Sequence, residues 1–265
     1  MNKEAKLRRI YLDIKEVKIQ GATNIAKAAV SAYTMKPTPV NKKKLLSLRP
    51  TEPTLSNALN FLEKIGSKKV ISHFSNAQEK INKFVFKLIR NGMIIYTHCR
   101  STNVVKALIY AKKKGKKFRV YVTETRPLLQ GRITSKELSK AGIKTTEWLD
   151  AAMDDAITGA DLILLGADAI LTSGVINKIG SEAIAEIAYL RKKPVYIVAD
   201  SWKFSPKNVK IEERDFHEVW KNAPKKIKIR NPAFEKIDKK YIKGIISEYG
   251  ILSFDRFVEK MHKLL

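Results

Sequence analysis

The chain has 265 residues, 44% of them hydrophobic and 29% charged, a composition typical of a soluble globular protein with a sizeable core. No apolar run reaches the ~20 residues that cross a bilayer, and the basic start lacks the apolar stretch of a signal peptide. The single cysteine excludes an internal disulfide, so we expect a reducing, cytoplasmic location.

The net charge of +26 arises from 52 Lys and Arg against 26 Asp and Glu. Such a surface attracts polyanions in general. However, the basic runs are scattered over the ends of predicted elements and are not interleaved with aromatic residues. We therefore interpret them as a solvated surface, and we do not expect a nucleic acid or a membrane as partner.

The first part of the chain has helical periodicity. Apolar residues recur three and four positions apart in three segments, 24–33, 54–66 and 76–92. Thr54 opens the second segment and Gly66 closes it, and both residue types are common at helix ends. We predict an N-terminal helical domain over residues 1–91.

After Gly92 the pattern changes to short apolar runs that alternate with helical segments. The runs are 93–97, 118–124, 145–150, 161–168 and 194–200. This alternation predicts an α/β fold in which residues 92–265 form a Rossmann-like, doubly wound parallel sheet. Glycine-rich nucleotide loops and zinc-ligand spacings are missing from the sequence, so no cofactor and no metal is expected.

Several polar residues fall at or just beyond the predicted carboxyl ends of strands, where doubly wound sheets bind ligands. They are Cys99, Glu124, Arg126, Asp150, Asp168 and Asp200. Polar residues are also common in loops, so position alone does not decide between a site and ordinary loops.

Cys99 is the candidate with the most distinctive position. A lone cysteine is most often a small buried hydrophobe. Cys99, however, directly precedes a predicted helix start, where Ser101 or Thr102 can act as the cap. The amides and the positive dipole end of that helix favour a thiolate. We therefore predict a lowered thiol pKa and a role as base or nucleophile.

Asp168 ends a very apolar run, and burial there predicts a raised carboxyl pKa, which suits a general acid. Asn177 and Lys178 are expected in a turn before a helix. Lys178 can neutralise a phosphate and Asn177 can orient a hydroxyl, although a plain surface turn is the alternative. Arg126, which precedes Pro127, is either a phosphate clamp or a structural ion-pair residue.

The motifs "THCRS", "VTETRPLLQGRITSKEL", "LLGADAI", "GVINKIG" and "SWKF" occur in this order. Together they resemble the family of translation initiation factor 2B alpha, beta and delta subunits and their isomerase relatives. The resemblance extends from about residue 17 to about residue 255. Within the family, the chain is most similar to the archaeal ribose-1,5-bisphosphate isomerases.

The resemblance implies conversion of ribose 1,5-bisphosphate to ribulose 1,5-bisphosphate in AMP salvage, with Cys99 and Asp168 as the acid–base pair and no cofactor. It also implies a homodimer or hexamer, and it leaves a nucleotide such as AMP open as an activator. The substrate-binding positions that it implies are Gln20, Gly21, Ala22, Thr23, Arg49, Ser101, Thr102, Asn103, Asn177, Lys178 and Lys203.

Three features depart from the isomerase pattern: Gln20 replaces an arginine, the N-terminal region is shorter, and the loop "GADAILTSGVINK" is one residue short. The main alternative is a non-catalytic regulatory subunit that binds initiation factor 2 or a nucleotide. A methylthioribose-1-phosphate isomerase is a third interpretation. The presence of both Cys99 and Asp168 favours the bisphosphate isomerase, because the regulatory subunits generally lack the cysteine.

Overall fold

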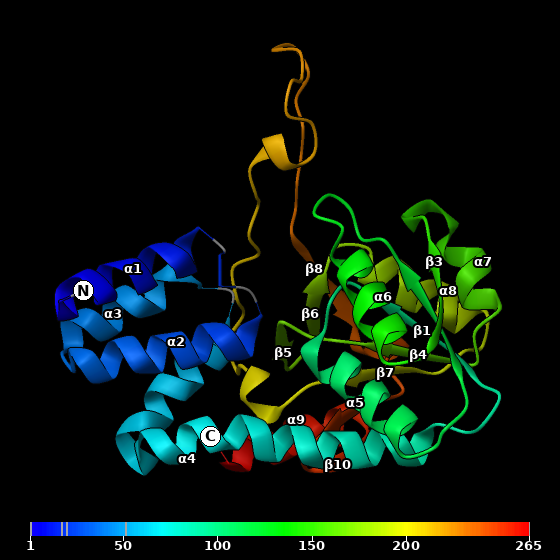
Figure 1. Ribbon diagram of the computed structural model, residues 1–265, viewed down its shortest axis with the longest axis horizontal. Coiled ribbons are helices and arrows are strands. Elements are labelled where there is room, and N and C mark those ends of the chain that lie inside the picture. Colours follow the sequence, from blue (N-terminus) through cyan, green and yellow to red (C-terminus); the bar gives the residue numbers. More distant parts are fainter. Residues whose placement is uncertain (1, 17, 20, 51, 265) are drawn as a thin grey trace.

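The computed structural model describes residues 2–264 except 17, 20 and 51. Four helices form the N-terminal part: α1 (Lys3–Lys15), α2 (Ala22–Met35), α3 (Pro39–Leu48) and α4 (Pro53–Leu88). Helices α1 to α3 pack together at one end of the molecule, and α4 leads from there to the sheet (Figure 1). The predicted segments 54–66 and 76–92 both fall in the region of α4, whose helical dihedral angles are interrupted at Gly66 (φ 77°).

A seven-stranded sheet has the order β10-β9-β7-β4-β1-β2-β3, and all its neighbouring strands are parallel except the antiparallel pair β9 and β10. Its strands are β1 (Ile94–His98), β2 (Arg119–Thr123), β3 (Lys144–Trp148), β4 (Leu162–Leu165), β7 (Val195–Val198), β9 (Gly244–Ser247) and β10 (Gly250–Leu252). The α/β class and the helical N-terminal region that the sequence predicted are confirmed.

Helices cover both faces of this sheet, because its central strands are apolar on both sides. In β1, for example, Ile95 packs on one face and Tyr96 on the other. The first face is covered by the second half of α4 with α5 (Thr102–Lys113) and α6 (Gln130–Lys140). The second face is covered by α7 (Met153–Thr158), α8 (Ser181–Leu190) and α9 (Phe254–Leu264). No described helix is long and apolar enough to span a membrane.

A smaller antiparallel sheet lies beside the strand ends and contains β5 (Ala169–Leu171), β6 (Gly174–Lys178) and β8 (Phe234–Asp238). The prediction of a turn at Asn177 and Lys178 is therefore wrong, since both residues end β6. Their backbones pair with β8, a partner that is distant in sequence.

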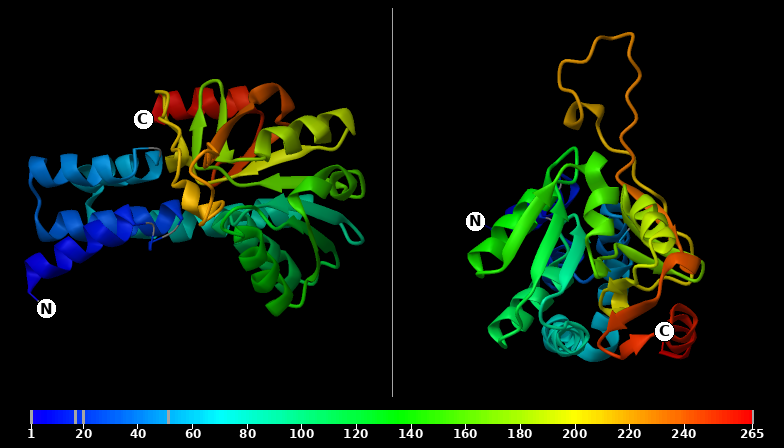
Figure 2. Two further views of the ribbon diagram at one scale, coloured as in Figure 1. Left: turned by 90° about the horizontal axis from the view of Figure 1, so that it is seen from above. Right: turned by 90° about the vertical axis from the view of Figure 1, so that its right-hand side faces the viewer.

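Residues 205–233, which we call the arm, project away from the body of the molecule (Figures 1 and 2). Backbone hydrogen bonds join its two sides near its base: Ala233 N donates to the Glu212 carbonyl, and Arg214 N donates to the Asn231 carbonyl. The arm contains the short 3-10 helix η3 (Phe216–Glu218). Two other 3-10 helices, η1 (Asp150–Ala152) and η2 (Ser201–Lys203), follow β3 and β7, and η4 (Lys239–Tyr241) follows β8.

Candidate active site

The strand order reverses between β1 and β4, so the helices that follow these two strands lie on opposite faces and leave a crevice. Cys99 directly follows β1, and Asp168 lies three residues beyond the end of β4. The two predicted acid–base residues therefore meet at the position where doubly wound sheets bind ligands. Gly166 permits this approach, because a methyl group there would lie 2.6 Å from the Cβ of Ser101.

A pocket at this point is lined by most of the predicted site residues. They are Gly21, Ala22, Thr23, Arg49, Cys99, Ser101, Thr102, Asn103, Asp168, Asn177, Lys178 and Lys203. Arg126 does not line it; its guanidinium donates to the Val219 carbonyl in the arm (3.2 Å). Gln20 lies outside the described residues.

Cys99 is held in a left-handed backbone conformation (φ 61°), which is uncommon for a residue other than glycine. Its amide donates to Thr125 Oγ1 (2.9 Å), and its carbonyl accepts from Thr134 Oγ1 (2.8 Å). Asp150 fixes the Thr125 loop in turn by accepting from the amides of Thr125 and Arg126 (2.8 and 2.7 Å). These contacts hold the strained turn that places Cys99 at the pocket wall.

The prediction of a lowered pKa for Cys99 is wrong in this pocket. Burial raises the pKa of the thiol to about 12, although the Arg100 amide and Lys178 act in the opposite direction. Cys99 is therefore a thiol at neutral pH, and its thiolate is a minor, strongly basic form. The helix-end effect assumed from sequence is outweighed by the desolvation of the sulfur.

His98 directly precedes Cys99 and is buried. Its Nε2 lies 3.0 Å from the Ile179 carbonyl, which only accepts, so Nε2 carries the proton. Its Nδ1 then accepts from Thr123 Oγ1 (2.6 Å). Burial lowers the pKa of His98 to about 4, which keeps the ring neutral at pH 7. With both nitrogens engaged, His98 supports the turn rather than exchanging protons.

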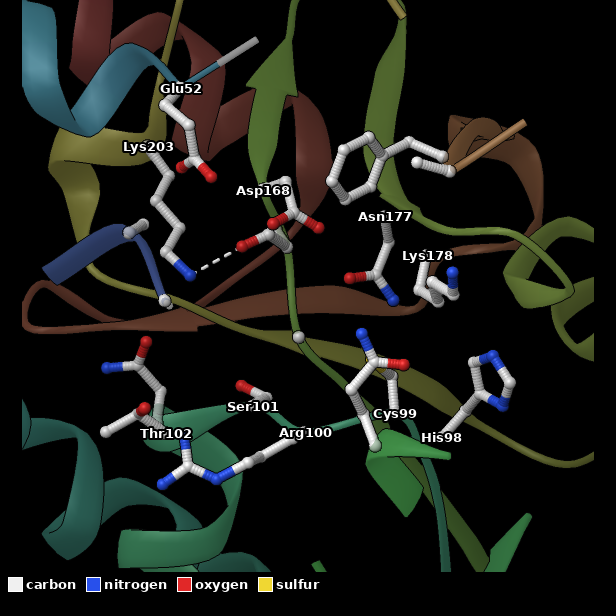
Figure 3. A pocket seen from close by; sticks show the side chains of 18 of the residues that line it. Glu52, His98, Cys99, Arg100, Ser101, Thr102, Asp168, Asn177, Lys178 and Lys203 are labelled. Carbon is white, nitrogen blue, oxygen red and sulfur yellow. Dashed lines mark hydrogen bonds between the residues drawn. The ribbon is translucent and has the colours of Figure 1, made fainter. Parts of the chain in front are cut away.

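Asp168 is half-buried, and burial raises its pKa, in the direction that the sequence predicted. Lys203, Arg49 and Lys178 oppose the shift. The Lys203 ammonium donates to the Ala167 carbonyl (2.5 Å), which holds the cation next to Asp168. Figure 3 shows Lys203 on one side of Asp168 and Lys178 on the other.

Two helix N-termini also reach the pocket. Gly21 (φ 84°) precedes α2, and Ser101 caps α5 by accepting from the Val104 amide. A methyl group at Gly21 would lie 3.9 Å from Thr102 Oγ1, so the two helix ends are close together. Free amides and the positive dipole ends make such positions favourable for phosphate.

Three cationic side chains in the pocket are buried: Arg49 is 7%, Lys178 5% and Lys203 7% exposed. Burial lowers the pKa of Lys178. Asn177 beside it donates to Ser181 Oγ (2.8 Å), which orients the amide group. Positive groups on both sides of Asp168 fit a ligand with two anionic ends.

Sequence reasoning missed Glu52 and Arg214, which also line the pocket. Glu52 stands in the helix-start segment "RPTEPTL", where a carboxylate suggests an ordinary cap. Arg214 belongs to the arm, more than a hundred residues after Cys99, and Glu218 holds its guanidinium. The "IEER" stretch that contains Arg214 has several charged residues but no signal that marks one of them as a site residue.

Comparison with known proteins places these residues in a family context. Residues 19–254 match the initiation factor 2 subunit family. A ribose 1,5-bisphosphate isomerase of Methanocaldococcus jannaschii is 35% identical, with 93% of this chain and 91% of that protein covered. The protein of the same name from Archaeoglobus fulgidus is 34% identical, with 78% and 76% covered.

The similarity extends to solved structures. The translation initiation factor eIF-2B of Pyrococcus horikoshii superposes with a TM-score of 0.84 at 26% identity, covering 94% of this chain and 98% of that one. A 5-methylthioribose 1-phosphate isomerase of the same organism shares the fold (TM-score 0.75, 23% identity, 98% and 88% covered). The matches to isomerases support an isomerase function, and the chain belongs to the initiation factor 2 subunit family.

Proposed function

We propose that this protein is an isomerase that converts ribose 1,5-bisphosphate to ribulose 1,5-bisphosphate. The observation that carries the proposal is the pocket in which buried cations flank Asp168 on both sides, and which Cys99 also lines. Two adjacent helix N-termini and Lys203 suit one phosphate, and Lys178 with Arg214 suits the other. A sugar with a single phosphate would leave one of these two positions without an anion.

The chemistry follows from the substrate. A phosphate on the anomeric oxygen prevents opening to a free aldehyde, so the C1–ring-oxygen bond must break with the phosphate in place. Asp168, whose pKa is raised by burial, gives its proton to the ring oxygen. The thiolate of Cys99 takes the proton from C2, which forms an enol between C1 and C2. The Cys99 thiol returns this proton to C1 while the C2 hydroxyl loses its own, which yields the ketone.

Because the thiolate is the minor form of Cys99, its formation contributes to the barrier. Lys178 and the Arg100 amide stabilise the thiolate charge. Burial also makes the thiolate a stronger base, which helps removal of a weakly acidic carbon-bound proton. We therefore expect the rate at low pH to increase as pH rises.

The decisive experiment incubates the purified protein with ribose 1,5-bisphosphate and resolves the sugar phosphates by NMR. We expect ribulose 1,5-bisphosphate from the wild type and none from Cys99→Ser, since a serine hydroxyl is too weak an acid to supply an equivalent base. Ribose 5-phosphate and methylthioribose 1-phosphate serve as control substrates. Turnover of methylthioribose 1-phosphate alone, or wild-type rates in Cys99→Ser, would refute the proposal.

A regulatory subunit is the second candidate. It is favoured by the similarity to a putative translation initiation factor eIF-2B subunit 2-like protein of Pyrococcus furiosus, which is 28% identical with 93% of this chain and 96% of that protein covered. Calorimetric titration separates the candidates: heat on addition of ribose 1,5-bisphosphate supports the isomerase. Binding of initiation factor 2 without binding of the bisphosphate supports the regulatory function.

We also propose a homo-oligomer with a dimer as the smallest unit, and AMP as a candidate activator. Fold neighbours include a tetrameric eIF2B complex from C. thermophilum, which is 16% identical and therefore supports the fold alone. Light scattering tests the assembly, and a particle with the mass of one chain would contradict it. Isomerase assays with and without AMP test the activator.

A further inference from the structure

Glu52 occupies the N-cap position of α4, where short polar side chains usually accept hydrogen bonds from helix amides. Its side chain makes no such bond; it enters the pocket, where it is 4% exposed (Figure 3). One carboxyl oxygen, Oε1, lies 3.4 Å from Arg49 Nη2. The other, Oε2, is buried without a hydrogen-bond partner among the described residues. Because Glu52 lines the pocket and an unpaired buried polar atom costs stability, this oxygen is available to a group inside the pocket.

The charged groups that face Glu52 come from four elements. Arg49 comes from the end of α3, Asp168 from the segment after β4, Lys203 from η2 and Glu212 from the arm. Asp168 therefore adds a second negative charge beside Glu52. Two carboxylates in one buried site retain a proton more readily than either alone. Burial, reinforced by Asp168, raises the pKa of Glu52 to about 7, although Arg49 and Lys203 oppose the shift.

We propose that Glu52 is a positioning residue that keeps Asp168 supplied with its proton during turnover. This inference rests on the isomerase function proposed above. After Asp168 has given its proton to the ring oxygen, the Glu52 carboxyl passes its own proton to the Asp168 carboxylate. The proton that leaves the C2 hydroxyl, when the enol becomes the ketone, then restores Glu52. Protons and charge balance over the cycle, and no other reactant is required.

The ratio of wild-type to Glu52→Gln kcat/KM, measured between pH 5 and 9, tests this role. Ionisation of the substrate phosphates and of Cys99 contributes equally to both proteins, so it cancels in the ratio. Below pH 7 Glu52 is protonated, and we expect a constant ratio on the order of 100, at the lower end for loss of a proton-transfer group. Above pH 7 wild type loses the proton and Glu52→Gln has none to lose. The ratio should therefore fall as pH rises.

A structural role predicts a different result. If Glu52 only supports the fold, Glu52→Gln lowers the melting temperature and the ratio of kcat/KM does not change with pH. That outcome overturns the inference, as does a ratio near one throughout. Glu52→Asp keeps a carboxyl group and should retain the pH-dependent step at a reduced rate. Glu213→Gln is the matched control, because it removes a neighbouring arm carboxylate that pairs with Arg230 and does not line the pocket, and it should keep the wild-type pH dependence.

A titration without turnover separates this inference from the isomerase proposal. With ¹³C-labelled glutamate, a carboxyl resonance that titrates near pH 7 should be present in wild type and missing in Glu52→Gln. If that resonance is found but ribose 1,5-bisphosphate is not converted, the isomerase proposal is refuted, whereas the titration of Glu52 near pH 7 is supported. If the bisphosphate is converted but no such resonance exists, the role of Glu52 fails while the isomerase function stands.

Discussion

Two pairs of buried or half-buried carboxyl groups lie near Lys203 and differ in what surrounds them. The pocket pair, Glu52 and Asp168, faces the candidate active site. The junction pair, Asp200 and Glu248, lies where η2 meets α4, and neither residue lines the pocket. Lys203 acts on both pairs. Its positive charge opposes the rise in the pKa of Glu52 and of Asp168, and it helps to lower the pKa of Asp200.

The junction pair lies away from the pocket, next to Ser201 and His73. Glu248 accepts from the Ser201 amide (3.0 Å) and the Ser201 hydroxyl (2.5 Å). His73 Nε2 lies 3.9 Å from Asp200 and 3.8 Å from Glu248, and its ring stacks on Trp202 at 3.8 Å between centroids. For Asp200, burial acts to raise the pKa, but His73 and Lys203 outweigh it and the pKa is lowered. The comparison teaches that burial alone does not mark a functional acid; an acid with a raised pKa and an oxygen open to a pocket does.

The largest contrast should come from Asp168→Asn and Asp200→Asn. An amide cannot transfer the proton, so Asp168→Asn should lose activity by roughly 10²–10⁴-fold. Because burial raises the pKa of Asp168, its ionised form is unfavourable in the fold, and the melting temperature at pH 8 should not fall. Asp200 has a lowered pKa, so its charge stabilises the fold at neutral pH. Asp200→Asn should therefore lower the melting temperature and leave kcat nearly unchanged.

Isomerase assays and thermal unfolding on the same preparations check this pair of variants. Loss of stability without loss of specific activity in Asp168→Asn would show that Asp168 is structural. Loss of kcat in Asp200→Asn would show that the junction pair takes part in the reaction.

The second contrast concerns the stability of Glu52→Gln at different pH values. The pKa of Glu52 is raised from 4.5 to about 7, so wild type loses stability as pH rises through this range. Glutamine has no such penalty. The free energy of unfolding of Glu52→Gln relative to wild type should therefore increase by up to about 3 kcal/mol between pH 4 and pH 8. Urea unfolding at several pH values measures it, and a difference that does not depend on pH would exclude a raised pKa.

The sequence predicted the positions of the site residues better than it predicted their pKa values. Cys99 and Asp168 could be placed because both follow short apolar strands, and the parallel order brings such ends together. The sign of the Cys99 shift could not be predicted, because it depends on how completely the fold desolvates the sulfur. Arg126 was misleading because a cation beside a proline at a strand end has the same pattern whether it faces the pocket or the arm.

The smaller sheet could not be predicted from local sequence patterns either. β6 pairs with β8 about sixty residues later, and only this pairing makes Asn177 and Lys178 part of a strand. Glu52 was missed for a related reason. Its sequence position predicts a helix cap, and the contacts that turn it toward Asp168 and Lys203 come from other parts of the chain.

The smallest contrast is Ser201→Ala at the junction pair. The variant removes the hydroxyl donor to Glu248 and keeps the amide donor, so we expect a loss of about 1.5–3 kcal/mol at pH 8. The loss should diminish at acidic pH. Burial and Asp200 raise the pKa of Glu248, whereas the Ser201 hydroxyl lowers it. Without the hydroxyl, Glu248 binds its proton more readily, which offsets part of the lost hydrogen bond as pH falls. Urea unfolding at pH 5 and pH 8 measures the difference, and an equal loss at both values would mean that Ser201 does not stabilise an ionised Glu248.

Because Ser201 begins η2, which carries Lys203, KM for the bisphosphate is the kinetic readout to watch. An unchanged kcat with a modest rise in KM would show that the junction pair acts on the pocket only by placing Lys203.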